Sequence, residues 1–109
     1  MLDTTPLTAA VDRFADRLRA APQSRLQRGA AAEGLALARE LAVRAQRLQA
    51  PGQEPRIMPD AGVFVVADQV AVAGHDLAEA LRTAPPASTS SDVDEAVRLV
   101  AEAAARALG

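Results

Sequence analysis

The stretch RLQRGAAAEGLALARELAVRAQRLQ, residues 25–49, has the most regular apolar spacing in the chain. Steps of three and four residues are typical of one helical face and of a bundle seam whose helices cross at about +20°. The residues on this face are Leu26, Ala30, Gly34, Leu37, Leu41, Ala45 and Leu48. Ser24 and Gln27 have the spacing of a capping box, so we expect one helix over residues 25–49.

A ridge of small residues lies beside this face, formed by Ala30, Gly34, Ala38 and Ala42. A glycine inside a helix costs about 1 kcal/mol relative to alanine. We therefore expect the glycines of this helix to be compensated by a partner helix that packs closely against the ridge.

Proline-rich breaks at residues 21–22, 50–60 and 83–92 separate three further helices, because the residue before a proline is pushed out of the helical region. The predicted helices cover residues 6–20, 60 to 81 or 82, and 92 or 93 to 108. Asp60 is the expected cap of the third, with Ile57 and Met58 packed back on its first turn. Their core-facing residues are Leu7, Val11, Phe14 and Leu18; Val63, Val66, Val70, Ala73, Leu77 and Leu81; and Val93, Val97, Val100, Ala104 and Ala107. In the fourth helix, Glu102 and Arg106 are expected to form an i,i+4 ion pair.

The sequence thus predicts an all-α protein, an up-down four-helix bundle with short Pro-rich connections, as a single domain over residues 1–109. Its 27 alanines and two aromatic residues, Phe14 and Phe64, favour closely packed helices over strands. Predicted helix lengths of about 15, 25, 22 and 16 residues imply that the two central helices overhang the others.

The amino-acid composition argues against several classes of function. A net charge of −2 and the lack of aromatic residues spaced to stack bases argue against nucleic-acid binding. The chain has no cysteine, and its N-terminus lacks the basic start and apolar run of a signal peptide. Residues 61–74 are too short and too polar to span a membrane, so we expect a cytoplasmic protein without membrane contact. All twelve basic residues are arginine, which is typical of a GC-rich genome such as an actinobacterial one.

The only histidine, His75, is predicted to lie opposite the core stripe of the third helix. His75 and Asp76 resemble the histidine and following acid in the dimerisation helices of sensor kinases. The resemblance covers about four residues and implies a phosphoacceptor histidine, with the acid orienting or deprotonating its ring. Histidine phosphotransfer domains carry lysine and glycine where this chain has Ala78 and Glu79, and Glu79 would repel a phosphoryl group.

The sequence gives little support for a metal site or a catalytic site. Asp68, His75 and Glu79 share an outward face, but one histidine makes a poor transition-metal site, so no metal and no cofactor is expected. Without cysteine or tyrosine, no catalytic constellation can be assembled, and the protein is predicted to be non-enzymatic. The alternative for the whole outward face is an ordinary solvated helix surface.

The third helix also carries apolar residues off its core stripe, chiefly Phe64, Val65 and Val72. Such residues are either covered within the bundle by the connecting loops or exposed as an interface. We favour an interface, and expect a protein–protein interaction module that forms a homodimer, with an unidentified protein as a further partner. The alternatives are the phosphotransfer bundle and a small helical export substrate of an actinobacterial secretion system, which is similar in length and alanine content. The Trp-x-Gly turn and tyrosine-based export signal of those substrates are absent here.

Overall fold

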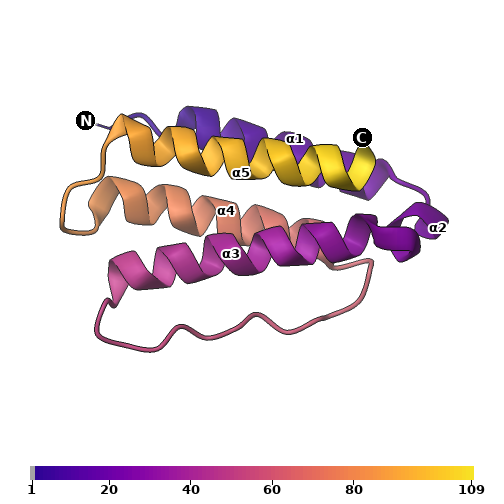
Figure 1. The fold of residues 1–109 in the computed structure, drawn as a ribbon, viewed down its shortest axis with the longest axis horizontal. Coiled ribbons are helices and arrows are strands. Elements are labelled where there is room, and N and C mark those ends of the chain that lie inside the picture. Colours follow the sequence, from indigo (N-terminus) through magenta and orange to yellow (C-terminus); the bar gives the residue numbers. More distant parts are fainter. Residues whose placement is uncertain (1) are drawn as a thin grey trace.

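The computed structural model describes residues 2–109, and all the secondary structure within them is helical. The elements are α1 Thr5–Ala20, α2 Gln23–Arg25, the π-helical turn η1 Leu26–Ala30, α3 Ala31–Gln49, α4 Val66–Thr83 and α5 Ser90–Leu108. The predicted four-helix bundle is confirmed, with α1, α3, α4 and α5 as its long helices (Figure 1).

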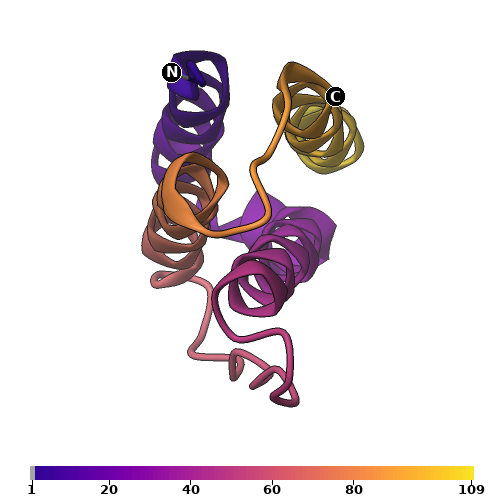
Figure 2. The same cartoon turned by 90° about the vertical axis from the view of Figure 1, so that its left-hand side faces the viewer.

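The four long helices occupy the corners of a quadrilateral (Figure 2). Helix α1 packs against α4 and α5, and α3 packs against the same two, so α1 and α3 are diagonal although they are consecutive in the chain. Helices α3 and α4 run parallel to each other and antiparallel to α1 and α5, which gives the order up, down, down, up (Figure 1). This order differs from the predicted up-down alternation with short connections, because the connection over residues 50–65 has to run back along the whole of α3 (Figure 1).

The helix predicted over residues 25–49 is broken at Gly29. This glycine has φ 147° and ψ −20°, a conformation that residues with a Cβ rarely adopt. A Cβ at Gly29 would meet no atom within 4 Å, so the glycine serves the backbone and not close packing. The predicted capping box is also wrong, since Pro22 precedes α2 and no side chain caps it.

Gly34, in contrast, lies where other helices pack closely, as predicted for the small-residue ridge. A Cβ there would lie 3.2 Å from Leu18 Cδ1 and 3.2 Å from Val66 Cγ1. Ala38, one turn further on, is fully buried. The end of α1 and the start of α4 therefore pack against the ridge, and this close packing compensates for the glycine.

The third long helix begins at Val66, so the predicted start at Asp60 is wrong. Asp60 caps a turn instead, because its Oδ1 accepts a hydrogen bond of 2.9 Å from the Gly62 N–H. Gly62 has φ 96°, outside the helical region. The predicted packing of Ile57 on the first helical turn is likewise wrong, since Ile57 is exposed, whereas Met58 packs against the core.

Side chains of α3 and α4 hold the 50–65 connection in place. The Gln46 amide donates to the Arg56 carbonyl at 2.9 Å and accepts from the Arg56 N–H at 2.8 Å. Arg39 Nε donates to the Met58 carbonyl at 2.8 Å, and Gln69 Nε2 donates to the Pro59 carbonyl at 2.9 Å. These bonds satisfy backbone groups that lie outside any helix.

Helix α5 begins at Ser90, earlier than predicted. Thr89 and Asp92 form its capping box, with the Thr89 N–H donating to Asp92 Oδ2 at 2.7 Å. The long helices have 16, 19, 18 and 19 residues, so the predicted overhang of the central pair is wrong.

Arg106 of α5 does not pair with Glu102. It bonds Glu33 of α3 at 2.9 Å, while Glu102 pairs with Arg98 at 3.0 Å. The Arg106–Glu33 pair therefore joins two antiparallel helices, and sequence spacing along α5 alone does not predict it.

The predicted core stripes point inward. The largest fully buried side chains are Phe14, Leu7, Leu18, Leu41, Leu77, Val11, Val70 and Val100. They come from all four long helices, so the bundle has one continuous core. The predicted stripe residues that stay only partly buried are Leu48, Val63, Val97 and Ala104.

Candidate functional site

The outer side of α4 and the chain just before it carry an apolar surface. Phe64 is 76% exposed, Val72 58% and Val65 39%. Ile57, which is 65% exposed, completes the large exposed hydrophobic residues of the part of the chain that the structure describes. All four fall within residues 57–72 of the sequence, and we call them the α4 surface. Val72 lies on α4, Val65 and Phe64 directly precede it, and Ile57 lies in the 50–65 connection.

Helical geometry explains why Val65 and Val72 stay outside. They are seven residues apart, so they lie on the same side of α4, two turns apart. The stripe that contains Val66, Val70 and Leu77 takes the side facing α3 and α1 and is buried. Of the two possibilities that the sequence left open, cover by the connecting loops does not occur for Phe64 or Val72.

The 50–65 connection borders the α4 surface. Gln69 lies one turn from both Val65 and Val72, and its amide holds the Pro59 carbonyl. Pro59 is thus held at α4, while Met58 and Arg56 are bonded to α3. Sequence reasoning missed Ile57 as part of this surface because it assigned the residue to the first turn of a helix that starts later.

Charged groups surround Val72. Asp68, one turn before it, bonds Arg19 of α1 at 2.9 Å, and this bond raises the pKa of the Arg19 guanidinium. Asp76, one turn after it, is exposed and has no hydrogen bond or ion pair within residues 2–109. The α4 surface is therefore an apolar patch with a charged rim.

His75 lies on the outer side of α4, as predicted, but it faces α1. Its Nε2 is 2.8 Å from Asp12 Oδ1, with both side chains about half exposed. The acid beside the ring thus comes from another helix and not from Asp76, the neighbour in sequence. No local signal predicts Asp12, because the pairing depends on the register of α1 against α4.

Two outward acids on the same side as His75, Asp68 and Glu79, are bonded to arginines. Asp68 bonds Arg19, and Glu79 pairs with Arg82 within α4. Arg82 also donates to Thr4 Oγ1 at 2.9 Å. Over residues 2–109, no group of three or more His, Cys, Asp or Glu side chains is arranged to hold a metal ion.

No helix in residues 2–109 is long and apolar enough to cross a membrane. No family model, no curated protein and no solved structure matches this chain.

Proposed function

We propose that this protein is a non-enzymatic interaction module that forms a homodimer through the α4 surface. One observation carries the proposal: all four large hydrophobic residues exposed in residues 2–109 gather between Ile57 and Val72. Together they leave on the order of 400 Å² of side-chain surface in water. Exposed apolar surface in this amount is typical of interaction sites where it is contiguous. At about 25 cal/mol per Å², covering it supplies a substantial driving force.

A second copy can cover the exposed apolar residues with the same residues of its own, about a twofold axis. Asp68 and Asp76 lie one turn on either side of Val72. A twofold axis through Val72 would bring Asp76 of one copy opposite Asp68 of the other. Arg19 bonds Asp68 at 2.9 Å and Asp16 at 3.0 Å, so its guanidinium offsets part of the negative charge where these acids meet. An isologous antiparallel contact would then be apolar at its centre, with an acidic rim that Arg19 partly neutralises.

The area limits how strong this dimer is. A standard protein interface buries about 800 Å² on each partner. The α4 surface supplies about half of that, and the polar rim and the adjacent 50–65 connection have to supply the rest. We therefore expect a reversible dimer whose population depends on concentration, acting in the cytoplasm.

Light scattering and sedimentation velocity across a concentration series test the proposal. The wild-type protein is expected to reach twice the mass of one chain. Val72→Glu is expected to remain folded and monomeric, because it buries a charge at the centre of the contact. Ala101→Glu places the same charge on an exposed position of α5 and is expected to dimerise like the wild type. A wild-type protein that is monomeric at high micromolar concentration contradicts the proposal.

The phosphotransfer alternative has weaker support, because Asp12 already occupies His75 Nε2. Incubation with a small-molecule phosphodonor tests it. An acid-labile mass increase that is absent in His75→Ala would favour this alternative, and we expect none. The export-substrate alternative rests on length and alanine content alone.

A further inference from the structure

A cavity of about 350 Å³ opens at the end of the bundle where α3 and α4 finish and α5 begins. It lies away from the residues of the α4 surface. Its apolar wall consists of Leu48, Leu77, Leu81 and Ala96, and residues 86–88 of the connection before α5 close one side. Its size is near the lower end of the range for small-molecule sites, about 300–1,000 Å³.

The helix arrangement explains the hollow. Helices α4 and α5 are diagonal, so they do not fill the space between them by direct packing (Figure 2). Ala96 is the apolar residue that α5 contributes to this wall. Ala96, Leu77 and Leu81 are buried and form the floor of the hollow, while Leu48, Pro86 and Ala87 line its more exposed part.

Most charged groups on the cavity wall are already paired. Arg44 bonds Glu40 at 2.9 Å and lies 3.6 Å from Glu95, and Glu95 is also 3.9 Å from Arg98. Asp92 accepts the hydrogen bonds of the Thr89 cap. Glu95 is therefore neutralised by arginines, whereas Asp92 is held at the helix cap and keeps its charge.

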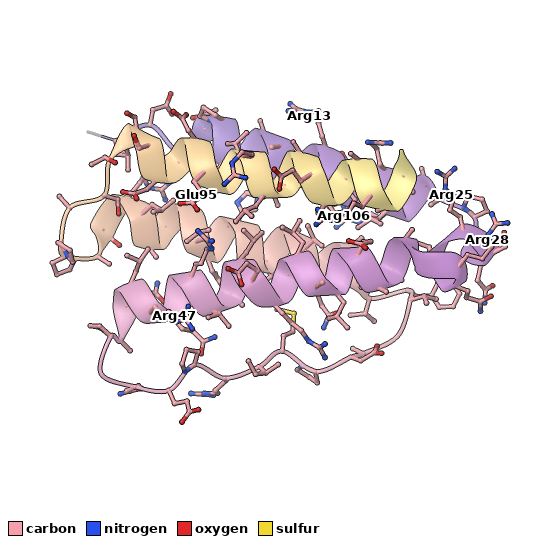
Figure 3. The ribbon with its side chains drawn as sticks, in the orientation of Figure 1. Arg13, Arg25, Arg28, Arg47, Glu95 and Arg106 are labelled. Atoms are coloured by element: carbon pink, nitrogen blue, oxygen red, sulfur yellow. The ribbon has the colours of Figure 1, made fainter. Side chains whose placement is uncertain are left out.

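Arg47 is the exception among the charged groups on this wall. It has no hydrogen bond or ion pair within residues 2–109, and it lies on α3 at the same end of the bundle as Glu95 on α5 (Figure 3). Ser88, on the opposite loop, adds a hydroxyl with no hydrogen bond in that range. A free guanidinium and a hydroxyl at the edge of an apolar hollow are suited to a carboxylate.

We propose that this cavity binds a small amphiphilic carboxylate, with its apolar chain against Leu48, Leu77 and Leu81 and its carboxylate at Arg47. The apolar wall gives most of the affinity, and Arg47 selects the charge of the ligand. The proposal is independent of the dimer, because none of these residues belongs to the α4 surface.

Nuclear magnetic resonance titration with decanoate tests the proposal. We expect saturable shifts of the methyl signals of Leu48, Leu77 and Leu81. Two probes with the same chain length separate the contributions: 1-decanol lacks the charge, and decyltrimethylammonium reverses it. Decanoate is expected to bind the most tightly of the three.

Two variants and one control locate the site. Arg47→Gln is expected to weaken decanoate binding at least about fivefold, as the loss of a charged hydrogen bond implies, and to leave 1-decanol unaffected. Arg13→Gln removes an arginine on the far edge of the bundle that likewise has no hydrogen bond or ion pair within residues 2–109, and it is expected to change neither (Figure 3). Ala96→Leu fills the hollow and is expected to abolish binding of all three probes, with the dispersion of the spectrum confirming its fold.

Several results overturn the proposal. They are the absence of shifts at millimolar decanoate, equal decanoate affinity in Arg47→Gln, tighter binding of the cationic probe, and shifts confined to Phe64, Val65 and Val72. The last result would show only general adsorption to the exposed apolar surface.

Discussion

Gly74 of α4 lies so close to Val11 of α1 that a Cβ on the glycine would come within 2.4 Å of Val11 Cγ2. Both residues are buried, so neither can move aside into solvent. This is the tightest approach at any glycine of the structure, and it fixes the spacing between α1 and α4.

Gly74→Ala is expected to destabilise the protein by about 1–3 kcal/mol, the usual cost of overpacking, despite the better helix propensity of alanine. Chemical denaturation measures the loss. Val11→Ala in the same chain is expected to restore part of it by making room. Gly52→Ala is the matched control, because a Cβ there meets no atom within 4 Å, and its stability is expected to stay the same or rise slightly. An unchanged stability in Gly74→Ala would show that the two helices can separate freely.

Gln46→Ala is expected to loosen the 50–65 connection while leaving the helices intact. The variant removes both hydrogen bonds to Arg56, whose backbone groups have no helical partner. Hydrogen exchange is expected to increase at Arg56 and its neighbours but not in the middle of α4. Gln49→Ala, at an exposed position at the end of α3, is the control. Equal exchange rates in Gln46→Ala and the wild type would mean that Arg39 and Gln69 hold the connection alone.

His75→Ala is expected to change the free energy of unfolding by at most about 0.5 kcal/mol, since a polar contact between half-exposed side chains contributes little. A double-mutant cycle with Asp12→Ala isolates the pair, and its coupling energy is expected to stay below about 1 kcal/mol. A loss of several kcal/mol would contradict the half-exposed position and assign the histidine a structural role.

The sequence pattern predicts the core residues well but predicts poorly where each helix begins and how the helices connect. Leu41 and Leu77 each belong to a set of apolar residues at helical spacing, and this spacing places the whole set on one buried face. Gly29 and Gly34 look alike in sequence, yet one breaks the helix and the other packs against Leu18, because the difference depends on which helix lies opposite. The late start of α4 has a local cause, the turn of Asp60 and Gly62, which the sequence stretch Asp-Ala-Gly is able to form.

The polar pairs between helices could not be predicted from the sequence, because they too depend on which helix lies opposite. Arg106 has Glu102 at favourable spacing and still bonds Glu33, and His75 has Asp76 beside it and still bonds Asp12. In both pairs, the neighbouring helix brings a carboxylate to the side on which the residue already points. The exposure of Val72 was predictable, because Val72 lies on the side of the helix opposite the core. Phe64 is exposed as well, but it precedes the helix.

Asp3 gives the start of α1 a pH-dependent stabilisation. Its Oδ1 accepts a hydrogen bond of 2.9 Å from the Thr5 N–H, one of the first amides of the helix. Hydrogen bonding from Thr5 lowers the pKa of Asp3 below its ordinary value. A carboxyl whose pKa is lower in the folded state stabilises the fold above its unfolded pKa, and loses that contribution as pH falls through its folded pKa.

Asp3→Asn is therefore expected to be less stable than the wild type near neutral pH, and the gap is expected to close on acidification. Denaturation midpoints of both proteins between about pH 7 and about pH 2 measure the convergence. Asp94→Asn, which alters an exposed aspartate with no hydrogen bond in residues 2–109, is the control for general charge effects. A gap between Asp3→Asn and the wild type that stays constant over this range would mean that the hydrogen bond to Thr5 does not depend on the charge of Asp3.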